Sequence, residues 1–195
     1  MSISTATRTQ RLTLIAILSA ISFSLMIFPQ FPIVPGADFL KVDFSIVPVM
    51  IALYWLGLSA AISTIVIRTI LKLVLANEGV NTYLGLPVNI VAMLSFIIVI
   101  FIMMPRFQET SMVRQAIAIV VSTIILAFVG IMMNLFIAVP LYSQFANFDI
   151  PKYIGLWRYL VAMVLPFNLI QGVIWGAVSM MVLTMIKPLH RRFNS

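Results

Sequence analysis

The chain of 195 residues is 63% hydrophobic and only 9% charged, and its charged residues lie in clusters between long apolar stretches. This pattern is typical of a polytopic membrane protein. Although the net charge is +7, the basic residues flank the apolar stretches and form no groove with interleaved aromatic residues, so we predict no nucleic-acid partner. The chain has no cysteine, which excludes disulfides and thiolate metal sites.

The apolar stretches predict an all-α integral membrane protein with six transmembrane helices in a single domain, 1–195. Residues 44–76 as one helix would reach roughly 50 Å at about 1.5 Å per residue, more than the bilayer core, so we predict a break at Gly57-Leu58-Ser59. The expected helices cover residues 11–28, 44–56, 59–76, 83–104, 114–138 and 159–187.

Basic residues at both ends of the chain predict the orientation. Arg8 and Arg11 precede the first helix, and Lys187, Arg191 and Arg192 follow the last. By the positive-inside tendency both termini are therefore expected in the cytoplasm, which requires an even number of spans. We expect a multi-pass protein of the bacterial plasma membrane, in contact with lipid.

Catalytic and nucleotide-binding signals are missing from the sequence. The single histidine, His190, lies in the basic tail, and there is no HExxH, no GxSxG and no pair of intramembrane carboxylates. We therefore expect no enzyme activity, no metal and no cofactor. Because GxxxxGK[ST] is also missing, any ATP-driven transport would need a partner that carries the phosphate-binding loop.

Uncharged amides occur in three of the predicted helices at a similar depth. Asn89, Asn134 and Asn168 lie roughly 9–14 Å below the outer boundary at about 1.5 Å per residue, and Gln171 follows Asn168 by one turn. One interpretation is that each amide bonds a neighbouring helix. The other is a pocket for a neutral solute with alternating N–H and C=O groups, which the shared depth favours.

The first outer loop, residues 29–44, is rich in proline and aromatic residues and cannot be helical throughout. We expect it to cap an outward-facing pocket and to stack Phe39 on a planar ligand; the alternative is a simple linker. In the third helix, Arg68 and Lys72 lie toward the outer half, where both side chains are expected to reach solvent along the helix.

Two pairs of small residues four apart could support close contact between helices. Ala16 and Ala20 lie in the first predicted helix, and Gly172 and Gly176 lie in the sixth. Such spacing allows two helices to approach closely, and packing within the bundle is the expected role of both pairs.

Four segments, taken together and in order, resemble the riboflavin-binding S-component of energy-coupling factor (ECF) transporters. They are Leu40-Lys41-Val42-Asp43-Phe44-Ser45-Ile46-Val47-Pro48, Gly85-Leu86-Pro87-Val88-Asn89, Asn134-Leu135-Phe136-Ile137-Ala138-Val139-Pro140-Leu141-Tyr142 and Pro166-Phe167-Asn168-Leu169-Ile170-Gln171-Gly172. The likeness implies a six-helix subunit that captures riboflavin for ATP-driven uptake. Its implied partners are a transmembrane coupling subunit and two cytoplasmic ATPases.

The resemblance also implies roles for individual residues. Asn134, Asn168 and Gln171 would meet the isoalloxazine ring, and the other implied pocket residues are Phe39, Lys41, Gly85 and Asn89. Ala16 and Ala20 would form the surface for the coupling subunit. Asp43 is expected to hold the loop at the start of the second helix, because neutral riboflavin has no charge to pair with it.

The chain departs from the family pattern at three positions. Ile46 and Leu86 stand where the family usually has acids, and Gln171 stands where it usually has lysine. Two other interpretations therefore stay open: an S-component for another planar vitamin such as thiamine, and a membrane scaffold that binds no solute.

Overall fold

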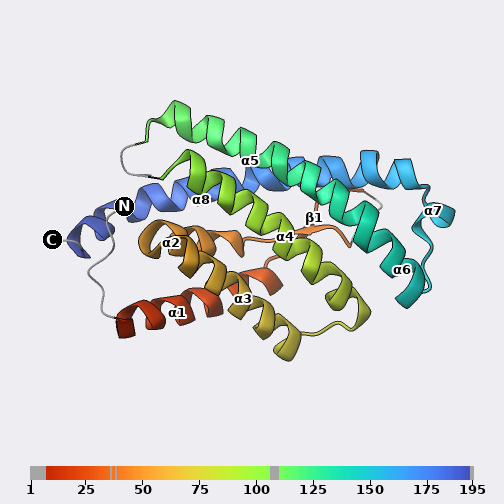
Figure 1. Ribbon diagram of the computed structural model, residues 1–195, viewed down its shortest axis with the longest axis horizontal. Coiled ribbons are helices and arrows are strands. Elements are labelled where there is room, and N and C mark those ends of the chain that lie inside the picture. Colours follow the sequence, from red (N-terminus) through yellow and green to blue (C-terminus); the bar gives the residue numbers. More distant parts are fainter. Residues whose placement is uncertain (1–7, 36, 38, 106–109, 194–195) are drawn as a thin grey trace.

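The computed structural model describes residues 8–35, 37, 39–105 and 110–193, which form an elongated bundle of helices (Figure 1). Within these residues, five helices are long and apolar enough to cross a membrane, and one apolar helix is shorter. The shorter one is α2 (Ile46–Leu56), whose 11 residues reach about 16 Å at about 1.5 Å per residue. The second predicted span, 44–56, is therefore too short to cross the bilayer core by itself.

The helices follow the apolar stretches of the sequence. The first is α1 (Arg8–Ile27), and α2 is separated from α3 (Leu58–Leu75) by Gly57 alone. Gly57 has a φ of 89°, a conformation that residues with a Cβ rarely adopt, so the chain turns sharply there. The next helix is α4 (Val80–Met103).

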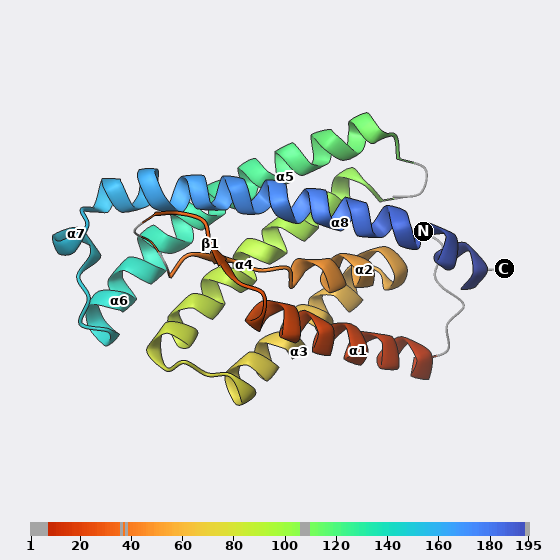
Figure 2. The same ribbon diagram turned by 180° about the vertical axis from the view of Figure 1, so that it is seen from behind.

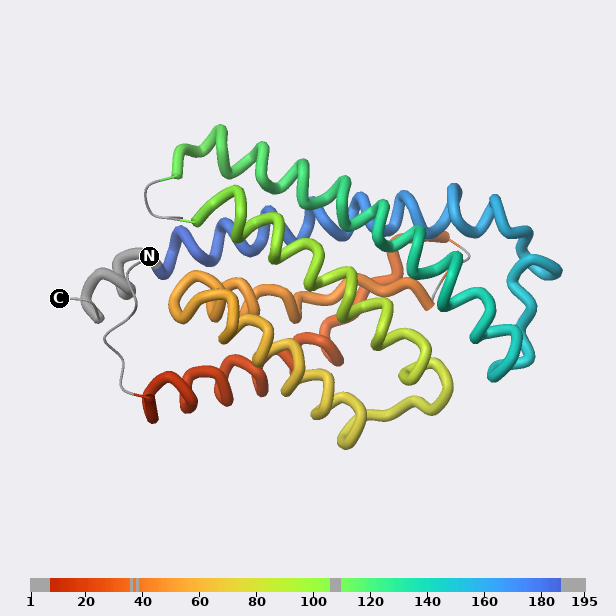
Figure 3. The backbone as a smooth tube through the Cα atoms, in the orientation of Figure 1, coloured from red at the N-terminus to blue at the C-terminus, as the bar shows by residue number. Residues whose placement is uncertain are grey.

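The second half of the chain forms two long helices that each contain a π-helical segment. Here α5 (Met112–Met133), η2 (Asn134–Ala138) and α6 (Val139–Phe145) are continuous, so the span predicted to end at residue 138 extends to Phe145. After the short α7 (Ile150–Tyr153), η3 (Arg158–Val164) leads into α8 (Leu165–Phe193). The tube in Figure 3 follows this path from green to blue.

The segment between α1 and α2 contains a two-stranded antiparallel ribbon that the sequence did not predict. β1 (Phe31–Pro32) pairs with β2 (Lys41–Val42), with Phe31 opposite Val42. Val34, Ala37 and Val42 are buried against Phe167 of α8. The segment thus lies along the bundle on the side of α6 and α7, as Figure 2 shows from behind.

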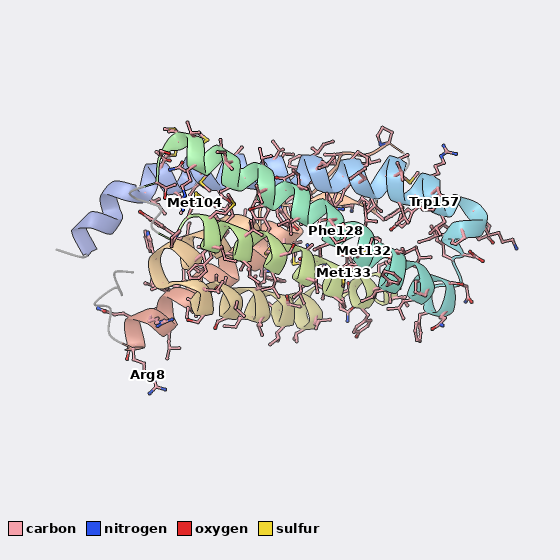
Figure 4. All side chains as sticks on the ribbon, turned by 45° about the horizontal axis from the view of Figure 1, so that its top comes forward. Arg8, Met104, Phe128, Met132, Met133 and Trp157 are labelled. Carbon is pink, nitrogen blue, oxygen red and sulfur yellow. The ribbon has the colours of Figure 1, made fainter. Side chains whose placement is uncertain are left out.

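The close packing of α5 on α8 depends on glycine. A Cβ added at Gly172 would lie 2.7 Å from Thr123 Oγ1, and one added at Gly176 would collide with Ile119. The small-residue pair in the sixth predicted helix therefore serves packing within the bundle. Large apolar side chains instead cover the outside, for example Phe128 and Trp157, which Figure 4 labels and which are 62% and 76% exposed.

Candidate ligand-binding site

A partly open cavity lies between α4, the two π-helical segments, α8 and the loop segment that contains β2. Its volume is about 150 Å³, roughly ten times the space that one buried water molecule requires. The cavity is smaller than the roughly 300–1,000 Å³ that is typical of small-molecule pockets. It is partly open, and both polar and aromatic side chains line it.

All seven residues predicted to bind a ligand line this one cavity. They come from the loop, α4, η2 and α8, and they are Phe39, Lys41, Gly85, Asn89, Asn134, Asn168 and Gln171. Helical spacing explains part of the convergence, because residues three or four apart share a face, as Gly85 and Asn89 do on α4. That these residues contact a solute remains a prediction.

Backbone hydrogen bonds fix the orientation of two amides. Asn134 Nδ2 donates to Gly130 O at 2.8 Å, and Asn168 Nδ2 donates to Val164 O at 2.8 Å. Because a carbonyl oxygen only accepts, the NH₂ group of each amide faces its own helix. The oxygen of Asn134 accepts from the Tyr159 hydroxyl at 2.6 Å. Helix contacts and a ligand pocket are therefore compatible roles for these amides.

Tyr159 is the most informative lining residue that the sequence reasoning missed. Its side chain is buried, its hydroxyl bonds Asn134, and its ring centroid lies 6.2 Å from that of Phe39. Asn134 begins η2 and Tyr159 lies in η3, and π-helical turns occur frequently at functional sites. A tyrosine in an otherwise apolar run was the available signal. The other lining residues not predicted are Leu40, Leu84, Val88, Ala92, Ala138, Tyr142 and Phe167.

The expectation that Arg68 reaches solvent was wrong. Its side chain is 0% exposed, and it donates to the Ser45 hydroxyl and, at 2.6 Å, to Asn89 Oδ1. Arg68 is buried because it lies on the face of α3 that points toward α2 and α4 rather than toward lipid. The expectation was wrong for Lys72 as well, because this residue is only 7% exposed. Lys72 pairs with Glu78 beyond the end of α3, at 2.6 Å, and this hydrogen bond lowers the pKa of Glu78.

Asp43 holds the end of the loop in the way that was expected. Its Oδ1 accepts from the Ser45 backbone N–H at 2.8 Å, directly before α2 begins. Its backbone carbonyl accepts from Trp175 Nε1 of α8 at 3.0 Å. The loop is therefore tied to two helices at this point.

The three departures from the family pattern differ in their location. Ile46 and Leu86 are buried apolar side chains, and neither is among the described residues that line the cavity. Gln171 lines the cavity and is 5% exposed. A difference in ligand preference would therefore be expected to originate at Gln171.

The alanines of α1 lie on its outer face. Ala16 and Ala20 are exposed, whereas the buried residues of this helix include Ile15, Leu18 and Ser19. Packing within the bundle, the expected role of this pair, does not occur at these two positions. A small-residue surface is thus left on the outside of the molecule.

The fold defines a multi-pass, all-helical membrane protein with a partly open cavity, lined by polar and aromatic side chains, between its helices. A family model described as the substrate-specific component of ECF transporters matches residues 10–183. The chain belongs to this family, so it is a component of a transporter and not an enzyme.

Individual relatives agree with this assignment. The chain is 60% identical to a protein of Leuconostoc mesenteroides described as the riboflavin transporter RibU, over the whole of both chains. It is 43% identical to a protein of the same description from Streptococcus thermophilus, over 94% of this chain and 85% of the relative. A solved structure of the S component of a bacterial ECF transporter has the same fold, with a TM-score of 0.76 at 24% identity, over 94% of this chain and 98% of that one.

Proposed function

We propose that this chain captures riboflavin from outside the cell in the cavity described above, for ATP-driven uptake by partner subunits. The observation that carries the proposal is the meeting of three asparagines, one glutamine and several aromatic rings in one cavity. The descriptions of the relatives from Leuconostoc mesenteroides and Streptococcus thermophilus support riboflavin as the solute.

The chemistry of the cavity suits a flat, neutral ligand. The pyrimidine edge of the isoalloxazine ring alternates C=O and N–H groups, and amide side chains can both donate and accept. The flat faces of the ring suit aromatic neighbours such as Phe39, Tyr159 and Phe167. We assign Lys41, Gly85 and Asn89 to the same site and Gln171 to the ring edge.

The proposed topology has six crossings and both termini in the cytoplasm. The start of α1 and the end of α8 lie at one end of the molecule, and α7 lies at the other (Figure 1). α2 is too short to cross alone, so the extended residues before it complete the second crossing. Irregular backbone at membrane depth is tolerated there because it packs on protein. In this orientation the loop caps the cavity from outside.

The proposed partners are a transmembrane coupling subunit and two cytoplasmic ATPases. The chain carries no phosphate-binding loop of its own, so the energy must come from another subunit. The exposed pair Ala16 and Ala20 offers a surface on which another helix could approach closely. We assign this pair to the coupling subunit.

The solute carried through purification tests the proposal. We expect a yellow protein with flavin absorbance, and riboflavin by mass spectrometry of the released ligand. A colourless protein that carries thiamine or another planar heterocycle would instead identify a different S-component. An empty, stable protein that binds no added vitamin would support the scaffold.

A further inference from the structure

Arg68 is a buried cation that bonds a residue of the cavity without lining the cavity itself. Its guanidinium donates to Ser45 at the start of α2 and to Asn89 Oδ1 in α4, at 2.6 Å. An intramembrane charge is costly unless it is paired, so such a residue is expected to have a function.

The chemistry of the two groups fixes the direction of the Asn89 amide. A guanidinium has five N–H donors and no acceptor, whereas an asparagine amide has one oxygen and one NH₂ group. Asn89 must therefore present its oxygen to Arg68. Its NH₂ group is the end that remains for the cavity, which Asn89 lines.

Arg68 is itself held in place from several sides. Ser45, which accepts from it, has its N–H bonded to Asp43 Oδ1 at 2.8 Å and its carbonyl bonded to Ser22 Oγ at 2.7 Å. The guanidinium thus sits in a network that joins α1, the end of the loop and α3.

We infer that Arg68 is a positioning residue for the binding site: it holds Asn89 as a fixed N–H donor, and the solute places an acceptor oxygen or nitrogen opposite it. Without Arg68 the amide could rotate and present either end. This inference rests on the proposed function, because its test uses riboflavin as the probe. The carbonyl groups, ring nitrogens and hydroxyls of riboflavin supply the acceptors.

A double-mutant cycle on the full chain in detergent tests the inference. Riboflavin affinity would be measured by fluorescence quenching for wild type, Arg68→Met, Asn89→Leu and the double variant. We expect each single change to weaken binding at least tenfold and the double variant to bind within threefold of the weaker single variant, because Arg68 acts through Asn89. Losses that multiply, or an Arg68→Met variant with wild-type affinity, would overturn it.

Asn89→Asp keeps the test decisive if Arg68→Met does not fold. Aspartate retains an oxygen for Arg68 but replaces the NH₂ group by a second oxygen. We expect a melting temperature no lower than that of wild type and an affinity at least tenfold weaker. Wild-type affinity in this variant would refute the inference.

The same variants separate a failure of the inference from a failure of the proposed function. If wild type itself does not quench riboflavin fluorescence, the proposed ligand is wrong. The melting temperatures then still test the contact, because Asn89→Leu should lower the melting temperature and Asn89→Asp should not. A lower value for Asn89→Asp would show that Asn89 does not present its oxygen to Arg68.

Discussion

Asn134 and Asn168 are the residues on which the proposed binding site depends most. Both are buried at the cavity, and replacing either by leucine would leave a polar ring edge without its partner. We expect Asn134→Leu and Asn168→Leu each to weaken riboflavin binding by about 1–3 kcal/mol in a fluorescence-quenching titration. Asn147→Gly is the control, because Asn147 lies outside the cavity and glycine tolerates its φ of 51°. Wild-type affinity in both leucine variants would remove these residues from the site.

Gly130 decides how closely α5 can approach Asn168. A Cβ built at this glycine would lie 2.6 Å from Asn168 Nδ2, so alanine must displace the amide. We expect Gly130→Ala to lower the free energy of unfolding by about 1–3 kcal/mol, as overpacking commonly does, and to weaken binding as well. Gly85→Ala is the matched control for stability alone, because a Cβ there meets nothing within 4 Å, whereas Gly85 itself belongs to the proposed site. Equal melting temperatures for Gly130→Ala and Gly85→Ala would contradict this account.

At the scale of elements, the ends of the helices define the sides of the membrane. Met112 begins α5 at the end where α1 starts, and Tyr153 ends α7 at the opposite end (Figure 1). Both side chains are exposed, and the chain has no natural cysteine to interfere with labelling. We expect an impermeant maleimide to label Tyr153→Cys but not Met112→Cys on intact cells, and to label both after lysis. The reverse pattern would invert the topology, and labelling of both on intact cells would contradict six crossings.

At the scale of the whole molecule, solute capture and coupling should be separable. The exposed pair Ala16 and Ala20 lies on α1, whereas the cavity is lined by other elements. We expect the double variant Ala16→Leu/Ala20→Leu to lose both uptake in cells and co-purification with the coupling subunit, because large side chains hold two helices apart. Riboflavin binding in detergent should be unchanged. Ala177→Leu, at an exposed alanine of α8, is the control. A double variant that transports normally would show that α1 is not the docking surface.

The sequence by itself determined the membrane class, the approximate helices and seven of the fifteen residues that line the cavity. Long uncharged runs identify spans because charges are costly in hydrocarbon. The seven predicted site residues could be named because amides in apolar helices are conspicuous and because the four segments resemble a known family. The break at Gly57 was predictable from helix length, and its φ of 89° explains the position.

The tertiary structure alone decided how each helix is rotated and which neighbours it meets. Lipid is as apolar as a protein core, so lipid-facing and buried surfaces carry similar residues and the sequence gives little sign of rotation. For this reason the burial of Arg68, its bond to Asn89 and the place of Tyr159 beside Asn134 could not be predicted. The ribbon and the short α2 likewise depend on contacts distant in sequence, such as that of Val42 with Phe167. Hydropathy locates a helix in the membrane, and only packing determines what its polar residues do there.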